Sequence, residues 1–397
     1  MTATVQADVD SGTRDVPSTL RSLTGLRFIA AFAVFLFHTG LSMNPMNLTG
    51  PAVSPFADDT VAHWYELIFS NAGFVGVSIF FVLSGFVISW SARPGHSAGG
   101  FIRRRLMKVF PNHVVMWAVV LLLFASQRAD WAVWLPNLFL VHAWIPDLTI
   151  ALGVNMPAWS LGSELLFYLL FPLLIGPISR LRGNRLWVWA GVMVAGLVLY
   201  KIAAMTVVPD GGDGVAVEPD LRYWFGYIFP VGRLFEFGLG ALLARVVLSG
   251  MRLPLRPLSA ALLSVVAYVA TLFVPAQFAL NLVTVVPVAL LVAALAAADV
   301  QGTRTGLANP LFVWFGKVSF GFYLVQVVTI FYLRDVTGAP QFSTPVAVLV
   351  LIGLFATSLL GGWLLHRFVE MPMMRRWAGR RAPSADPTPD RERVGAA

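Results

Sequence analysis

Long apolar runs that recur along the whole chain limit this sequence to a membrane protein. A helix of about 20 apolar residues, rising 1.5 Å per residue, crosses the ~30 Å hydrocarbon core of a bilayer. Only 12% of the 397 residues are charged, whereas about 25% is usual in soluble proteins. The sequence therefore predicts an all-α polytopic membrane protein with about ten transmembrane helices. The expected spans are residues 22–42, 70–91, 109–126, 158–179, 186–207, 223–248, 257–274, 279–299, 310–333 and 346–368.

The basic residues between these runs predict which helix ends face the cytoplasm. Four segments are rich in arginine, whereas the alternate loops 43–69 and 208–221 contain no lysine or arginine and carry acidic residues. Because basic loops face the cytoplasm, both termini are expected there. The parity holds only if the short run Trp131–Trp144 does not cross, so residues 127–157 are expected on the outer side. The basic segments contain Arg93, Arg103, Arg104, Arg105 and Lys108; Arg180, Arg182 and Arg185; Arg245, Arg252 and Arg256; and Arg375, Arg376, Arg380 and Arg381.

Polar ends flank a single membrane domain. Residues 1–20 and 378–397 are polar and charged, and they are expected to be disordered cytoplasmic tails. The membrane domain is therefore expected over residues 21–377. The first tail lacks the basic-then-apolar order of a cleavable signal peptide. We expect a multi-pass protein of a bacterial-type plasma membrane.

The charge and the cysteine content exclude several classes of protein. The net charge is +8, but the cations lie in short loops between apolar runs, which indicates orientation in a lipid bilayer rather than nucleic-acid binding. The chain has no cysteine, which excludes disulfides, a thiolate nucleophile and a cysteine-ligated metal. We expect no metal site.

The first span contains two residues that are costly to place in hydrocarbon, Arg27 and His38. An arginine at the centre of a membrane helix costs at least ~2.5 kcal/mol, so such residues usually face a protein-lined cavity. The eleven positions between them amount to about 20° more than three full turns, so both side chains lie on one helix face, about 16 Å apart. The alternative is structural: the arginine reaches toward the interface, and the histidine bonds a neighbouring helix.

Glu164 is an acid inside the apolar run 158–179. Counted at 1.5 Å per residue from the expected span ends, it lies about 9 Å below the outer surface and His38 about 22 Å above the inner one. The two depths nearly coincide in a core of ~30 Å. A carboxylate that orients a histidine favours general-base chemistry. Alternatively, Glu164 pairs with Arg233 or accepts hydrogen bonds from tryptophan and serine donors.

A basic group stands at the inner mouth of the third span, within FIRRRLMKVFP. Cations at the cytoplasmic face need no special function. Several of them within six residues at a helix start are also suited to hold a polyanion such as a nucleotide phosphate. The group consists of Arg103, Arg104, Arg105 and Lys108.

Two further pairs of charges are interpreted structurally. Arg233 and Glu236 are three residues apart and so neighbours on one helix face, which predicts a self-neutralising intramembrane pair. His366 and Glu370 lie at the inner boundary, where we expect a solvated ion pair.

A second candidate for the catalytic base is His142, which has the H-x4-D spacing of glycerolipid acyltransferases with Asp147. This two-residue pattern often occurs by chance. The neighbouring Trp144 and Pro146 favour an interfacial turn.

The ordered motifs of the chain together resemble a known family. The stretch LTGLRFIAAFAVFLFH at 23–38 is similar to the opening signature of the acyltransferase-3 membrane O-acyltransferases, in which ten residues separate an arginine from a histidine. The block at 73–86, GFVGVSIFFVLSGF, is similar to their second signature. Further matches are Arg105 with Lys108, W-S-L-x-x-E at 159–164 followed by Tyr168, R-x-x-E-F at 233–237, S-x-x-x-Y-L at 319–324 and E-x-P at 370–372. The short chain and its S-L-T-G-L-R-F opening most resemble actinobacterial members that acylate macrolides and their sugars.

The resemblance implies a ten-helix enzyme that moves an acyl group from cytosolic acyl-CoA, with acetyl-CoA expected, to a hydroxyl of a carbohydrate or macrolide-type natural product. His38 would be the general base, and Arg27 would stabilise negative charge or hold the acyl-CoA. Glu164 would be the acidic partner of His38. Arg104, Arg105 and Lys108 would bind the nucleotide phosphates, and Trp159, Ser160, Tyr168, Arg233, Glu236 and Tyr323 would contact substrate or support the site.

Two positions depart from the pattern of the family. Many members have aspartate where this chain has Ser78, so an aspartate that orients His38 is absent. Many have histidine where this chain has Gln326, which argues against acid–base chemistry at position 326. A covalent acyl-enzyme on histidine or serine stays open beside direct transfer, because Ser84, Ser160 and Ser163 are available.

The rival from another class is a polytopic transporter or channel. In that case Arg27, His38, Glu164, Arg233 and Glu236 would form a proton or substrate path. A third interpretation has these charges only joining helices. The sequence leaves the acceptor, the acyl length and the face at which the acceptor binds open.

Overall fold

The computed structural model of the protein describes residues 17, 19–44, 52–92, 97–128, 130–209 and 221–377, without the side chains of 125–128. Most of the two expected tails, and the acidic residues of the 208–221 loop, lie outside these ranges. Within them every regular element is a helix, and one isolated parallel bridge joins Phe56 to Phe342. The predicted all-α class is confirmed.

The long helices coincide with the apolar runs. Seven shorter helices, together with 3₁₀ and π turns, connect or extend them. The long helices are α1 (Arg21–Thr39), α3 (Ala72–Trp90), α4 (Ala98–Arg128), α7 (Ala158–Arg180), α8 (Asn184–Thr206), α10 (Pro230–Leu248), α11 (Pro257–Ala270), α13 (Leu282–Val300), α14 (Pro310–Val327) and α16 (Thr344–Leu365). The shorter ones are α2 (Asp59–Phe69), α5 (Trp131–Leu138), α6 (Leu148–Ala151), α9 (Leu221–Tyr223), α12 (Ala276–Ala279), α15 (Leu333–Val336) and α17 (Met371–Trp377).

Eight helical segments of the described chain are long and apolar enough to cross a membrane, which confirms a polytopic membrane protein. Two of the expected spans are not among the eight. Helix α11 and its 3₁₀ extension form a shorter apolar helix, Pro257–Phe273. Helix α10 carries Arg233, Glu236 and Arg245 within 19 residues, which lowers its apolar character. The count of ten spans and the sidedness of the termini stay predictions.

The run Trp131–Trp144 does not form a spanning helix. Helix α5 has 8 residues, which extend about 12 Å, far less than the ~30 Å hydrocarbon core. A 3₁₀ turn, His142–Trp144, and the four-residue α6 follow it. Asp130 and Asp147 cap α5 and α6 by accepting backbone N–H groups at 2.8 Å. These lengths agree with the expectation that the run does not cross.

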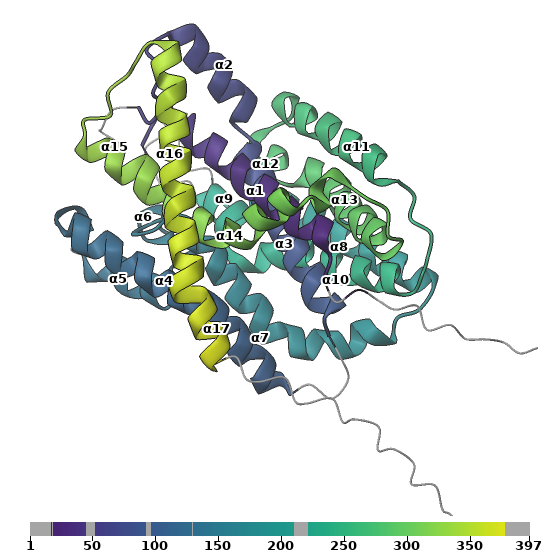
Figure 1. Cartoon of the computed structure of the whole chain (residues 1–397). Coiled ribbons are helices and arrows are strands. Elements are labelled where there is room, and N and C mark those ends of the chain that lie inside the picture. The colour runs from purple at the N-terminus through teal and green to yellow at the C-terminus, as the bar shows by residue number, and fades with distance from the viewer. Residues whose placement is uncertain are drawn as a thin grey trace, which may run out of the picture.

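Helices α1, α3 and α10 form the interior of the bundle, and the other helices lie around them (Figure 1). Helix α1 packs against α3 and α14, and α10 packs against α3 and α8. Helices α11 and α13 pair on one flank, and α4 and α5 lie on the opposite flank. Helix α16 packs against α14.

Helices α3 and α10 approach each other at two glycines. A Cβ atom at Gly85 would lie 1.9 Å from the carbonyl oxygen of Phe237, and one at Gly240 would lie 2.0 Å from the carbonyl oxygen of Val82. Each helix therefore lays its backbone on a glycine of the other. Close approach at small residues is a main source of helix association in membranes, where lipid is as apolar as the side chains.

We expect Gly85→Ala to lower the thermal unfolding temperature of the detergent-solubilised protein. The added methyl group meets backbone atoms that cannot rotate away, so α3 and α10 must separate, at an expected cost of about 1–3 kcal/mol. Gly191→Ala on α8 is the matched control, because nothing lies within 4 Å of its Cβ position. Equal stability of the two variants would contradict the tight contact.

Candidate active site

Helix α1 carries Arg27 and His38, and each lies in the wall of a different cavity. Arg27 lines a cavity of about 320 Å³, and His38 lines a second cavity of about 150 Å³. Eleven positions along a helix correspond to about 16 Å, so the two cavities follow one another along α1. We call them the inner and the outer cavity, after the sides of the membrane expected from the sequence.

The inner cavity has a positively charged wall. Four cationic side chains and two carboxylates line it. Such a wall suits a polyanion, because hydrogen bonds from arginine and lysine to phosphate are charge-assisted and strong. The exposed Lys317 marks a place where the cavity reaches the surface. The cations are Arg27, Arg105, Lys108 and Lys317, and the carboxylates are Glu164 and Glu370.

Glu164 lies in this inner wall and bonds within its own helix. The Tyr168 hydroxyl donates a hydrogen bond to Glu164 Oε2 at 2.5 Å, one turn along α7. The Arg105 guanidinium carbon lies 6.0 Å from the centre of the Tyr168 ring and 5.5 Å from that of Phe101. The charge of Glu164 also acts on Arg27. The structure therefore groups Glu164 with the cations of the inner cavity.

The predicted phosphate-binding cations divide into two sets. Arg105 and Lys108 line the inner cavity, and Arg104 is not among the described residues that line it. Lys317 joins them from α14. In the sequence, Lys317 is the one charged residue within the aromatic run FGKVSFGFY. A single charge in such a run is the sequence signal for a functional position there.

The structure differs from the expected solvated ion pair between His366 and Glu370. His366 Nδ1 lies 3.0 Å from Glu370 Oε2, so the predicted pair exists. The pair is partly buried rather than on the open surface, because both side chains line the inner cavity and are 23% and 10% exposed. The residues belong to a π turn, His366–Glu370, that continues α16 toward α17.

The outer cavity is apolar and aromatic around His38. None of the described residues that line it is a lysine, arginine, aspartate or glutamate. Polar atoms are supplied by the imidazole, an indole and the tyrosine hydroxyls. The aromatic residues of the wall are Phe37, Phe74, Trp159, Tyr223, Tyr227 and Tyr323.

The polar side chain beside His38 is Gln326. Burial leaves His38 only 4% exposed, and its Nδ1 and the Oε1 of the fully buried Gln326 both lack a regular hydrogen-bond partner. The two side chains nevertheless interact. Gln326 Nε2 donates to the Tyr323 carbonyl at 3.2 Å, which leaves Oε1 as the atom available to His38. Glu164, the acidic partner expected from the sequence, lines the other cavity.

The two cavities adjoin at α3 and α14. Val77 and Tyr323 line both of them. The Tyr323 hydroxyl lies 3.0 Å from Ser160 Oγ and 3.4 Å from the Pro157 carbonyl oxygen. Ser160 Oγ in turn donates to that carbonyl at 2.8 Å. Two predicted supporting residues, Ser160 and Tyr323, therefore stand at the junction.

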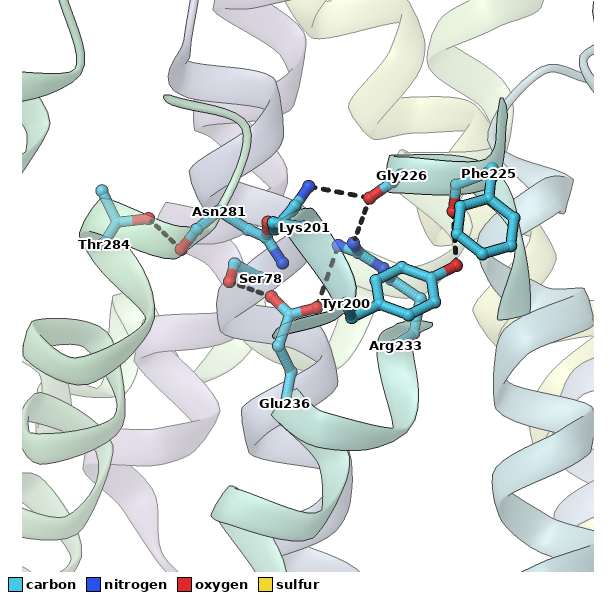
Figure 2. Close-up of polar contacts among 9 residues, drawn as sticks. All are labelled: Ser78, Tyr200, Lys201, Phe225, Gly226, Arg233, Glu236, Asn281 and Thr284. Carbon is cyan, nitrogen blue, oxygen red and sulfur yellow. Dashed lines mark hydrogen bonds and ion pairs between the residues drawn. The ribbon is translucent and has the colours of Figure 1, made fainter. Parts of the chain in front are cut away.

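A second buried polar group, which we call the charged cluster, lies between α3, α8 and α10 (Figure 2). Arg233 Nη1 and Glu236 Oε2 are 2.9 Å apart, and both side chains are almost fully buried, which confirms the predicted ion pair. Ser78 Oγ donates to Glu236 Oε1. Lys201 Nζ and Arg233 Nη2 both donate to the carbonyl oxygen of Gly226, at 2.7 and 3.1 Å.

The charged cluster supports the wall of the outer cavity. The Arg233 guanidinium carbon lies 4.8 Å from the centre of the Tyr227 ring, and Tyr227 lines that cavity. Ser78 belongs to this cluster and does not line the cavity of His38. Lys201 belongs to none of the sequence motifs, although a lysine inside an apolar span is itself a signal of a buried polar contact.

The rival pair His142 and Asp147 has a structural explanation. Asp147 Oδ1 accepts the backbone N–H groups of Thr149 and Ile150 at 2.8 and 3.4 Å, so it caps α6. His142 is fully buried in the 3₁₀ turn between α5 and α6. Burial, together with the nearby His113, lowers the pKa of the imidazole to about 3. Neither residue lines the inner or the outer cavity.

We expect Glu236→Gln to destabilise the protein strongly. The change leaves the buried cations Lys201 and Arg233 without the carboxylate that balances them, and such a loss costs about 3–5 kcal/mol. The measurement is thermal unfolding in detergent. Glu66→Gln is the control, because Glu66 accepts exposed hydrogen bonds from Ser42 on the surface. Equal unfolding temperatures for the two variants would show that the cluster adds no stability.

Comparison with known proteins identifies the chain's relatives. Residues 20–367 match the family described as Acyltransferase domain. The chain is 37% identical over 382 residues to Acyltransferase MdmB of Streptomyces mycarofaciens, and the aligned region covers 93% of this chain and 95% of that protein. It is 27% identical over 323 residues to Exopolysaccharide production protein ExoZ of Rhizobium meliloti, which covers 78% of this chain and 92% of that protein. No solved structure matches.

These matches extend over the helices that form both cavities, and they agree with the motifs found in the sequence. On this basis the chain belongs to the acyltransferase-3 family of membrane acyltransferases.

Proposed function

We propose that this membrane O-acyltransferase transfers an acyl group from acyl-CoA, with acetyl-CoA expected, to a hydroxyl of a carbohydrate or macrolide-type natural product. The observation that carries the proposal is the meeting of two chemically different cavities. One is cationic and contains Arg27, and the other is aromatic and contains His38. A polyanionic donor and a less polar acceptor would meet where the cavities join, at Tyr323.

The donor would enter the inner cavity. Arg105 and Lys108 would hold phosphate groups by charge-assisted hydrogen bonds, and Arg27 would extend the positive field toward the junction. The volume of about 320 Å³ lies at the lower end of the usual ligand pockets of about 300–1,000 Å³. It suits the extended pantetheine arm and the thioester, with the nucleotide at the mouth. Glu164 would balance the charge of Arg27.

The acceptor would bind in the outer cavity with its hydroxyl at His38. His38 Nε2 would take the proton of the hydroxyl while its oxygen forms a bond to the thioester carbonyl carbon. The carbon–sulfur bond then breaks, and the proton passes from His38 to the departing sulfur. The products are an ester and CoA, so no proton or electron is left over.

Gln326 would set the tautomer of His38. If Nδ1–H donates to Gln326 Oε1, the lone pair of Nε2 is free to act as the base. The hydrogen bond made by one ring nitrogen decides which form of a histidine is present. An amide would therefore do the orienting that the sequence assigned to Glu164. This role is compatible with the expectation that position 326 is not itself an acid or a base.

The chemistry of the outer cavity bears on the acceptor. Its aromatic wall without lysine, arginine or carboxylate side chains favours an acceptor with apolar faces, as in a macrolide or a deoxygenated sugar. The second relative carries a name that refers to exopolysaccharide production, so a carbohydrate acceptor stays within the proposal. Mass spectrometry of candidate alcohols after incubation with membranes and acetyl-CoA would detect the added acyl mass. Transport of an unchanged solute would contradict the proposal.

We expect His38→Ala to lower the rate of acyl transfer by about 10²–10⁴-fold, which is the usual contribution of a general base. The measurement is ester formation from labelled acetyl-CoA by purified protein. His63→Ala is the control, because His63 is exposed on α2. An active His38→Ala protein would exclude His38 as the base.

Gln326→Leu extends this test to the orienting role. We expect a loss smaller than that of His38→Ala, because the base is still present but its tautomer is no longer fixed. Loss of all activity in Gln326→Leu with full activity in His38→Ala would reverse the assignment.

We expect Arg105→Gln and Lys108→Gln to raise the KM for acetyl-CoA by about 10–100-fold each, because a hydrogen bond to a charged group contributes about 1.5–3 kcal/mol. The kcat at saturating donor should change little, because these cations line only the inner cavity and not the outer one. Arg180→Gln is the control, an exposed arginine at the end of α7. Unchanged KM values would place the donor phosphates elsewhere.

A further inference from the structure

The junction of the two cavities contains one polar side chain that belongs to both. The described residues common to the two walls are Val77 and Tyr323, and valine offers no hydrogen-bonding group. The following inference rests on the proposed acyl transfer. If donor and acceptor come from opposite cavities, the thioester carbonyl must lie at this junction when the acceptor oxygen attacks it.

Negative charge then develops on the carbonyl oxygen and needs a hydrogen-bond donor at the junction. Arg27 does not fill this need directly, because it lines only the inner cavity, about three turns along α1 from His38. His38 is engaged with the acceptor proton. The remaining polar groups at the junction are the hydroxyls of Tyr323 and Ser160.

The hydrogen bonds of these hydroxyls leave the tyrosine proton on neutral acceptors only. Ser160 has one proton, and it donates this proton to the Pro157 carbonyl at 2.8 Å. With the serine proton on that carbonyl, the Tyr323 hydroxyl can donate its proton to Ser160 Oγ at 3.0 Å or to the Pro157 carbonyl at 3.4 Å. Ser160 Oγ is a neutral acceptor, so a rotation of the Tyr323 O–H toward a developing oxyanion exchanges a neutral hydrogen bond for a stronger, charge-assisted one.

We propose that Tyr323 is a catalytic residue that donates a hydrogen bond to the thioester carbonyl oxygen and stabilises the oxyanion of the tetrahedral intermediate. The tyrosine keeps its proton throughout. The acceptor oxygen forms the new bond to carbon, the bond to sulfur breaks, and the proton removed by His38 ends on the sulfur.

The fold holds the Tyr323 ring in place for this role. Its ring packs against Phe80 of α3, with ring centres 5.6 Å apart. Its carbonyl accepts the hydrogen bond of Gln326, the residue beside His38. One turn of α14 thus carries both the proposed oxyanion donor and the residue that contacts the base.

The test is Tyr323→Phe, which removes the hydroxyl and keeps the ring. We expect kcat to fall by about 10²–10³-fold, the usual effect of losing one oxyanion donor, with the KM for acetyl-CoA changed by less than about threefold. Tyr268→Phe is the matched control, because the Tyr268 hydroxyl bonds the carbonyl of Ile68 away from both cavities. A kcat equal to that of the control would overturn the proposal.

A second measurement separates catalysis from structure. The infrared carbonyl stretch of ¹³C-labelled acetyl-CoA bound to the wild-type protein should lie at a lower frequency than that of the same thioester in an apolar solvent. This shift should vanish in Tyr323→Phe. Absence of a shift in the wild type would overturn the proposal even if the variant did not fold. Absence of any ester product from the wild type would instead contradict the proposed acyl transfer.

Discussion

The contact between α3 and α10 organises the molecule, because the backbone of each helix rests on a glycine of the other. Lipid offers no hydrophobic gain for helix association, so packing of this kind and buried polar bonds hold a membrane bundle together. Helix α3 then presents Val77 to the junction of the cavities and Ser78 to the charged cluster. The same contact therefore fixes both the reaction space and its support.

The two cavities differ in chemistry although the same helices form their walls. Helices α1, α3, α7 and α14 each contribute residues to both walls. Charge is concentrated in the inner cavity, and the outer one contains a histidine among aromatic rings. In the proposed reaction, a charged donor and an apolar acceptor would therefore be separated except where the two cavities adjoin. In the proposed mechanism, the amide of Gln326 would orient His38 as the base in this apolar setting.

The sequence predicted the features that depend on local spacing, namely helices and contacts within one helix. It did not predict which side chains of different helices meet, because the rotation of each helix about its axis decides that. The apolar runs indicated the helices, and the three-residue spacing of Arg233 and Glu236 predicted their ion pair, now found at 2.9 Å. The depth count for Glu164 predicted a position level with His38, but a count along one helix does not determine which neighbours its side chain meets, and Glu164 lines the inner cavity together with Arg27. Gln326 was judged by its residue type alone, because nothing in the sequence showed that it lies beside His38.

The buried Lys201 has a consequence for how the chain is inserted during synthesis. A lysine costs about 2.5–3.5 kcal/mol at the centre of an isolated membrane helix and less toward the ends, and Lys201 lies five residues before the end of α8 at Thr206. Its acceptor, the Gly226 carbonyl, and the balancing carboxylate of Glu236 both belong to the next segment of the chain. Helix α8 alone would leave Lys201 facing lipid. We therefore expect the stable insertion of α8 to depend on the segment that contains Gly226 and α10.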